Sequence, residues 1–209
     1  PISGTGLTRT AVFTPTANLG NGSVSMTVAA NAYQDAAGNN GGAGLSPSIA
    51  IDTLVPAITS LALTSTTGAI ASASDATVYN LNATDTLLAT VTFNDVLTVN
   101  TLGGSPSLAL IIGSSTVQAT YVSGSGTNAL TFSYTILANQ TDANGISLAT
   151  NALTLNGATL RDAVGNNANL ATAAVADSAN FKVDTTAAAA PTITTVADDV
   201  GSIITAVLS

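Results

Sequence analysis

The stretch L88-A-T-V-T-F93 decides the class of fold, because its residues alternate between an apolar face and a face that carries Thr. A period of two is that of a half-buried β-strand. The same alternation recurs in V24-S-M-T-V28, L61-A-L63, T116-V-Q-A-T-Y-V122, L130-T-F-S-Y-T-I136 and L153-T-L155. Strong turn formers separate these stretches, namely G103-G-S-P106, S123-G-S-G126, D142-A-N-G145 and D162-A-V-G-N166. Short strands with turns at this spacing predict an all-β fold built from Ig-like β-sandwiches.

The composition agrees with a strand-rich chain. The 209 residues are 46% hydrophobic but only 4% aromatic and 7% charged, with a mean hydropathy of +0.46. No window approaches the roughly 18 uninterrupted apolar residues of a membrane-spanning helix, so we expect no membrane insertion. All acidic residues are Asp, and there are three basic residues, so most of the straight-chain helix formers are missing.

The charge and the missing residue types exclude several functions. A net charge of −8 argues against nucleic acid as a partner, since such binding neutralises phosphates. Neither Cys nor His is present, which removes thiolate nucleophiles, zinc sites with sulfur or imidazole ligands, and Ser-His-Asp triads. A hydrolase that uses Asp alone remains chemically open, but nothing in the sequence points to one, and we expect no enzyme. The remaining charge is carboxylate, a ligand that Ca²⁺ prefers.

A two-part motif occurs twice. D35-A-A-G-N-N40 returns 127 residues later as D162-A-V-G-N-N167, and I51-D-T-L-V-P56 returns as V183-D-T-T-A-A-A-A-P191, with Asp52 and Asp184 132 residues apart. Recurrence at a near-fixed distance predicts repeated domains. Residues 56–190 are expected to form a complete Ig-like domain of roughly seven strands. Residues 1–55 would be the C-terminal part of a preceding domain, and residues 191–209 the start of a following one. The first residue is Pro1, so the chain is expected to be a piece of a longer protein.

The central stretch resembles the repeat of large bacterial Ig-like surface adhesins of the RTX and biofilm-associated type. The resemblance covers residues 57 to 190 and is carried by V91-T-F-N-D95, S105-P-S-L-A-L110 with Gly113, A119-T-Y-V-S-G-S-G126, L130-T-F-S-Y134, D142-A-N-G-I146, N151-A-L-T-L-N-G-A-T-L-R-D162 and V183-D-T-T186. It implies a secreted or cell-surface protein whose tandem domains form an extended stalk, commonly rigidified by Ca²⁺, that serves cell adhesion. One departure is the second linker, where extra Ala separates Asp184 from Pro191. This junction is expected to be looser than the first.

Loop geometry predicts where the acidic residues gather. If consecutive strands run antiparallel, connecting loops alternate between the two ends of the sandwich. Counting from a first strand near Ile58, the linker with Asp52, a loop after Phe93 with Asp95, and the turn with Asp162 and Asn166 lie at one end. Asp142 and Asp184 lie at the opposite end. Side-chain oxygens at either junction, with backbone carbonyls and water, would fill a Ca²⁺ site. The first copy of the turn, with Asp35 and Asn39, is a candidate for the same reason.

Other interpretations remain open. Each Asp turn is also an ordinary Asx turn, in which the carboxylate accepts local N–H groups and Gly takes a positive φ. Lys182 could form an isopeptide crosslink, although an outward-facing strand lysine is the simpler expectation. Tyr79, Tyr121, Tyr134 and Phe132 could stack on sugars, although their spacing first indicates a core. A structural repeat, which would pack against its neighbouring Ig-like domains, therefore competes with a carbohydrate-binding module. It also competes with a self-assembling filament or surface-layer subunit, in which identical subunits exchange strands.

Overall fold

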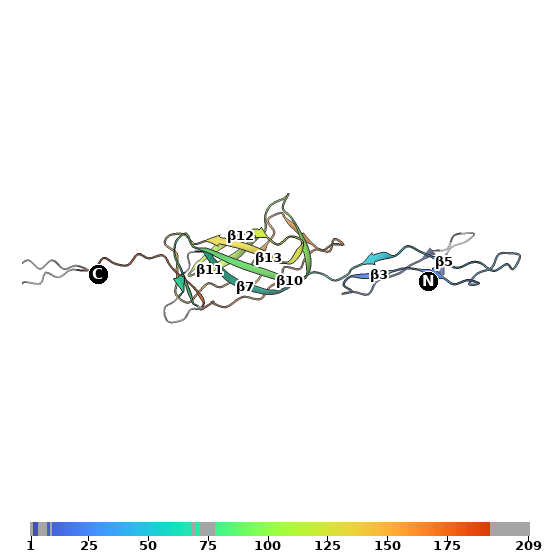
Figure 1. Ribbon diagram of the computed structural model, residues 1–209, viewed down its shortest axis with the longest axis horizontal. Coiled ribbons are helices and arrows are strands. Elements are labelled where there is room, and N and C mark those ends of the chain that lie inside the picture. Colours follow the sequence, from blue (N-terminus) through green and yellow to red (C-terminus); the bar gives the residue numbers. More distant parts are fainter. Residues whose placement is uncertain (1, 4–7, 9, 68–69, 72–77, 193–209) are drawn as a thin grey trace, which may run out of the picture.

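The computed structural model describes residues 2–3, 8, 10–67, 70–71 and 78–192, and every regular element in these ranges is a β-strand. The all-β class is therefore confirmed. Figure 1 shows a sandwich from which residues before 55 extend at one end, while the chain leaves at the other. Within these ranges no helix is long and apolar enough to cross a membrane.

The larger sheet is organised around one long strand, β10 (Thr86–Asn100). Along its first half β10 pairs on one side with β13 (Thr127–Thr135) and on the other with β7 (Ile58–Thr67), both antiparallel. The strand order runs β15-β11-β12-β13-β10-β16, with β7 also beside β10; the remaining members are β11 (Ser107–Ile112), β12 (Ser115–Ser123), β15 (Leu153–Thr154) and β16 (Thr159–Arg161). The predicted first strand near Ile58 is thus confirmed.

The core follows from the alternation in the sequence. Along β10 the side chains of Leu87, Ala89, Val91 and Phe93 are buried, while the Thr residues between them are only partly covered. Leu130 and Phe132 of β13 lie opposite Val91 and Ala89, and they are buried too. Each fully buried large aliphatic or aromatic side chain contributes about 1.5–3 kcal/mol through the hydrophobic effect, so this seam stabilises the sandwich strongly.

The smaller sheet covers the other side of the core with the order β14-β17-β9-β8, formed by β8 (Ile70–Ala71), β9 (Tyr79–Leu81), β14 (Thr141–Asp142) and β17 (Phe181–Asp184). β9 and β17 run parallel, and the rings of Tyr79 and Phe181 stack with centroids 5.7 Å apart. Lys182 lies between two buried residues of β17, which places its side chain on the outer face of the sheet. The expectation of an outward-facing strand lysine is confirmed.

The described residues before residue 55 form short strand pairs. β1 (Ile2–Ser3) pairs with β2 (Thr10–Ala11), β3 (Gly22–Val24) with β6 (Ile49–Ile51), and β4 (Thr27–Val28) with β5 (Gly44–Leu45). The predicted strand over residues 24–28 is therefore split in two. Among the side chains described before residue 55, none is buried. In its described residues this segment has strands but no buried core.

The loop predicted after Phe93 is wrong, because β10 runs unbroken from Thr86 to Asn100. β10 continues through this point, but its edge changes partner, since Phe93 pairs with Ile58 of β7 and Thr98 pairs with Arg161 of β16. The pairing with β13 is also irregular between Thr92 and Leu97. A β-bulge of this kind adds local twist and can redirect a side chain without ending the strand. The stretch from β7 to β17 also holds more strand elements than the seven expected, several of them only two to four residues long.

Candidate metal centre at the linker

Asp162 is held by the turn that it begins, directly after β16. Its Oδ1 accepts hydrogen bonds from the backbone N–H of Val164, Gly165 and Asn166 at 3.0, 2.7 and 2.9 Å, and its Oδ2 accepts one from Asn166 Nδ2 at 2.7 Å. Burial raises the pKa of this carboxyl, but the hydrogen bonds from the Asn166 side chain and from the three N–H groups outweigh it and hold the pKa below its usual 3.8. Asp162 is therefore a buried, charged group.

Asp35 makes the same turn. Its Oδ1 accepts the backbone N–H of Ala37 and Asn39, both at 2.9 Å, and its Oδ2 accepts Asn39 Nδ2 at 2.8 Å. The side-chain bond from Asn39, followed by the backbone bonds, lowers the pKa of Asp35. The glycines at the matching positions, Gly38 and Gly165, both have positive φ, of +86° and +101°. The Asx-turn interpretation is confirmed for both copies, so the turn itself accounts for the recurring letters.

Asp95 reaches the same place from the sheet. It lies at the point of β10 where the edge changes partner from β7 to β16, and its Oδ1 accepts the backbone N–H of Val96 at 2.7 Å. Because β16 leads directly into the turn of Asp162, the same change of partner brings the two carboxylates together. This position follows from strand pairing, not from a loop.

Asp52 comes from the linker that joins the short-strand segment to β7. Its Oδ1 accepts the N–H of Leu54 at 2.9 Å. The linker backbone is tied to the sandwich, since Asn166 Nδ2 donates to the carbonyls of Asp52 (3.2 Å) and Leu54 (3.4 Å), and Asn169 N–H donates to the carbonyl of Pro56 at 2.7 Å.

The linker is also hydrogen-bonded to the short-strand segment that precedes it. The N–H groups of Thr53 and Leu54 both donate to the carbonyl of Leu19, at 2.7 and 3.1 Å, and Thr53 Oγ1 donates to the carbonyl of Thr16 at 2.7 Å. The linker is therefore a hydrogen-bonded connection between the two parts and not a free tether.

The three carboxylates form one cluster. One oxygen from each of Asp52, Asp95 and Asp162 lies within 4.8 Å of the others, and this is the one such group of three or more acidic side chains in the part of the chain that the structure describes. Asp162 is buried and the other two are half-buried. Across the same described ranges, no cationic side chain is paired with any of them, and the nearby Arg161 donates to Asn167 instead. The expected convergence of these three residues is confirmed.

The donor set fits a hard cation. Ca²⁺ binds oxygens at 2.3–2.6 Å, so two oxygens on one ion lie at most about 5 Å apart, and a spacing within 4.8 Å satisfies this limit. Oδ1 of Asp52 and of Asp95 each accepts a single neighbouring N–H, which leaves lone pairs on both carboxylates. Asp162 Oδ1 already accepts three N–H groups, so its Oδ2, which accepts one, is the oxygen that could bind an ion. Three negative charges without a cationic partner repel one another, and a divalent ion would neutralise most of that charge.

The other predicted ligands are not gathered in this way. Asp142 is buried and accepts the N–H of Gly113 (2.8 Å) and Gly145 (2.9 Å), one on each oxygen. Asp184 is exposed, and its Oδ1 accepts the N–H of Thr186 at 2.9 Å. Asp142 and Asp184 line one shallow hollow at the far end of the sandwich, together with Lys182. Metal binding by these residues, and by Asp35 and Asn39, stays a prediction.

Two contributions were missed from sequence. The side-chain amide of Asn166 donates hydrogen bonds to the carbonyls of Asp52 and Leu54. These partners lie 114 and 112 residues from Asn166, so no local sequence pattern indicates the bonds. Asn94 also fixes the start of β7, since its Oδ1 accepts the N–H of Ala57 at 2.8 Å and its N–H donates to the Ala57 carbonyl at 3.0 Å. An Asn directly before Asp95 was the available signal.

Fold and site together define an all-β, sandwich-forming chain with an acidic cluster beside a linker. Residues 2–52 match a family model described as a bacterial Ig-like domain, which supports a bacterial Ig-like domain in that segment. No curated protein and no solved structure matches the chain.

Proposed function

We propose that this chain is a non-catalytic structural repeat of an extracellular bacterial adhesin or surface filament, and that Ca²⁺ stiffens its domain junctions. The observation that carries the proposal is the convergence of the Asp52, Asp95 and Asp162 carboxylates at the linker. The match of residues 2–52 to a bacterial Ig-like domain supports a surface module. Its partners would be the neighbouring Ig-like domains of the same chain.

The position of the cluster explains how an ion would act on the stalk. Asp52 belongs to the linker, whereas Asp95 and Asp162 belong to the sandwich, so one ion bound to all three joins the two parts. Without the ion the repulsion among the carboxylates opposes the hydrogen bonds that hold the linker to the sandwich. With the ion the repulsion is replaced by attraction to the cation, and the junction becomes harder to open. Reach and stiffness are what a stalk supplies to an adhesive tip.

A thermal-unfolding experiment on the 209-residue chain tests the proposal. An ion that binds only the folded state raises the free energy of unfolding by mass action, and with it the melting temperature. The gain is about 2.7 kcal/mol at an ion concentration one hundred times the Kd. We expect the melting temperature to be higher in millimolar Ca²⁺ than in chelator. Identical melting curves with Ca²⁺ and with chelator would reject the calcium-stiffened stalk.

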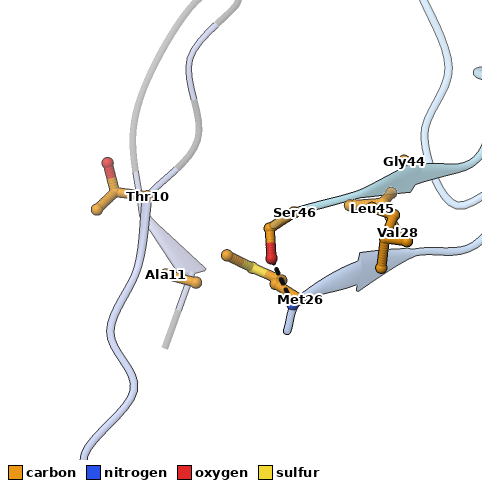
Figure 2. Close-up of a pocket in the computed structure, with 7 residues that line it drawn as sticks. All are labelled: Thr10, Ala11, Met26, Val28, Gly44, Leu45 and Ser46. Atoms are coloured by element: carbon orange, nitrogen blue, oxygen red, sulfur yellow. Dashed lines mark hydrogen bonds between the residues drawn. The ribbon is translucent and has the colours of Figure 1, made fainter. Parts of the chain in front are cut away.

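A second candidate function is a self-assembling filament subunit, favoured by one observation. Figure 2 shows an apolar hollow in the segment before residue 55, lined by Thr10, Ala11, Met26, Val28, Gly44, Leu45 and Ser46. Leu45 is 74% exposed and Ile49 is 63% exposed. None of the side chains described before residue 55 is buried, so these apolar side chains stay exposed in the monomer. A second copy of the chain could cover them and could pair with the edges of the short strands.

Sedimentation velocity over a hundredfold range of protein concentration separates the two candidates. A filament subunit associates as concentration rises, and a Leu45→Asp variant, which places a charge on the apolar hollow, should remain monomeric. A stalk repeat is monomeric at every concentration. Asp95→Asn serves as the matched control because it alters the carboxylate cluster and leaves the hollow unchanged.

A further inference from the structure

The side-chain amide of Asn166 contacts both the turn of Asp162 and the backbone of the linker. Its Nδ2 donates to Asp162 Oδ2 at 2.7 Å, to the Asp52 carbonyl at 3.2 Å and to the Leu54 carbonyl at 3.4 Å. An amide nitrogen carries two protons, so the first two bonds satisfy it and the third is long and weak. The nitrogen, a donor that cannot bind a cation, therefore faces the linker.

We propose that Asn166 is a positioning residue, a latch that holds the linker against the sandwich whether or not a cation is bound. It does so by fixing the Asp52 backbone, and through it the Asp52 carboxylate, beside Asp95 and Asp162. The inference deepens the proposed function and rests on it for the role of the cation. The hydrogen bonds themselves act without one.

The matching residue in the first copy of the turn shows what the latch adds. Asn39 donates to Asp35 Oδ2 at 2.8 Å, as Asn166 does to Asp162, but among the described residues its amide reaches no linker carbonyl. Asn39 is exposed, whereas Asn166 is half-buried. A change at Asn39 therefore removes the turn contact alone, while a change at Asn166 removes the turn contact and the link to residues 52–54.

The latch also explains how three like charges come to lie together before any ion arrives. The Asp52 carboxylate would move away from Asp95 and Asp162 if the linker were free, because their repulsion favours separation. The bond to the Asp52 carbonyl, together with the Asn169 N–H bond to the Pro56 carbonyl, opposes that movement. A cation would then meet a preformed site and would not have to order the linker as it binds.

The test measures the joint directly in the full chain. The sequence has no Cys, so Ser23→Cys in β3 and Thr116→Cys in β12, both exposed positions, give one spin-label pair that spans the linker. Distance distributions by double electron–electron resonance are recorded in chelator and in Ca²⁺ for the parent, Asn166→Ala and Asn39→Ala. We expect a narrow distribution for the parent and for Asn39→Ala in chelator. Asn166→Ala should be broad, its displaced population rising about 5- to 30-fold with the loss of one or two hydrogen bonds.

The outcomes separate the latch from the calcium proposal. A parent distribution that is broad in chelator, or an Asn166→Ala distribution as narrow as the parent's, overturns the latch whatever Ca²⁺ does. If Ca²⁺ changes neither distances nor melting temperature while the Asn166 effect stands, the latch holds and the calcium proposal fails. If Asn166→Ala melts far below Asn39→Ala, Asn166→Leu is measured instead, since it keeps the size of the side chain and the backbone N–H bond to Asp162 but cannot donate to the linker.

Discussion

The change Asp95→Asn should make the chain more stable in chelator and less stable in Ca²⁺. The substitution keeps the size of the side chain, and its amide oxygen can still accept the Val96 N–H that Asp95 Oδ1 accepts at 2.7 Å. What it removes is one negative charge from a group whose oxygens lie within 4.8 Å of one another. The variant therefore separates repulsion without the ion from attraction with it.

The magnitude follows from Coulomb's law. Two unit charges about 5 Å apart repel by about 0.8 kcal/mol at the dielectric constant of water and by about 3 kcal/mol at an effective value of 20. Asp95 and Asp52 are half-buried, so the lower end applies to each of the two pairs that Asp95 makes. We expect a gain of about 1–2 kcal/mol in chelator. For a chain of this length that is a rise of about 2–8 °C in melting temperature.

In Ca²⁺ the order reverses. The parent gains about 2.7 kcal/mol at a Ca²⁺ concentration one hundred times its Kd, and the variant loses most of this gain because the ion has lost a charged ligand. Differential scanning calorimetry in chelator and in Ca²⁺ measures both effects. Asp184→Asn is the matched control, since Asp184 also accepts a single nearby backbone N–H, that of Thr186, but lies outside the cluster. A variant that is less stable than the parent in chelator, or that keeps the full Ca²⁺ shift, would refute the reasoning.

Three further predictions follow from single residues. Thr84, a β-branched residue with φ of +79°, is strained, so Thr84→Gly should raise the free energy of unfolding in urea by about 1 kcal/mol. The lowered pKa of Asp162 means that its contribution is present above about pH 4 and is lost as pH falls through the folded-state value. Acid titration of Asp162→Asn should therefore show a flatter loss of stability below pH 4 than the parent. Gly124→Ala would place a Cβ 2.1 Å from the Ala129 carbonyl oxygen and should cost about 2–4 kcal/mol in urea unfolding, whereas Gly126→Ala, with open space around it, should cost about 1 kcal/mol.

Local patterns were enough to predict the strands of the sandwich and their buried faces. Alternation over residues 88–93 and 130–136 identifies which side chains face the core, because a strand has a period of two and burial follows it. The same patterns could not reveal that β10 changes partner between Phe93 and Thr98, since this depends on the placement of β16, which lies far away in sequence. The loop predicted after Phe93 was wrong for that reason.

The candidate site was predicted in part. Asp52, Asp95 and Asp162 were predicted to lie at one end of the sandwich from alternating strand directions. Their carboxylates do lie together, although Asp95 lies on a continuous strand with an irregular pairing and not in the predicted loop. The direction in which an amide points cannot be inferred from residue spacing, so the hydrogen bond from Asn166 Nδ2 to the linker was not predicted. Metal binding by Asn166 stays a prediction. Hydrogen bonds between distant backbone groups are fixed by packing, and packing is not visible in a motif.

The two linkers show why the length after the aspartate matters as much as the aspartate. In D52-T-L-V-P56 the Asp52 side chain accepts the N–H of Leu54, two residues on. Pro56 follows Asp52 by four residues, and its carbonyl accepts the N–H of Asn169. D184-T-T-A-A-A-A-P191 repeats the first contact, from Asp184 to Thr186, but its Pro comes seven residues after the Asp. Three extra residues can span about 10 Å when extended, which is twice the spacing of the cluster. A linker of the second length could leave its Asp beyond reach of a neighbouring domain's carboxylates, so the short linker is itself part of the site.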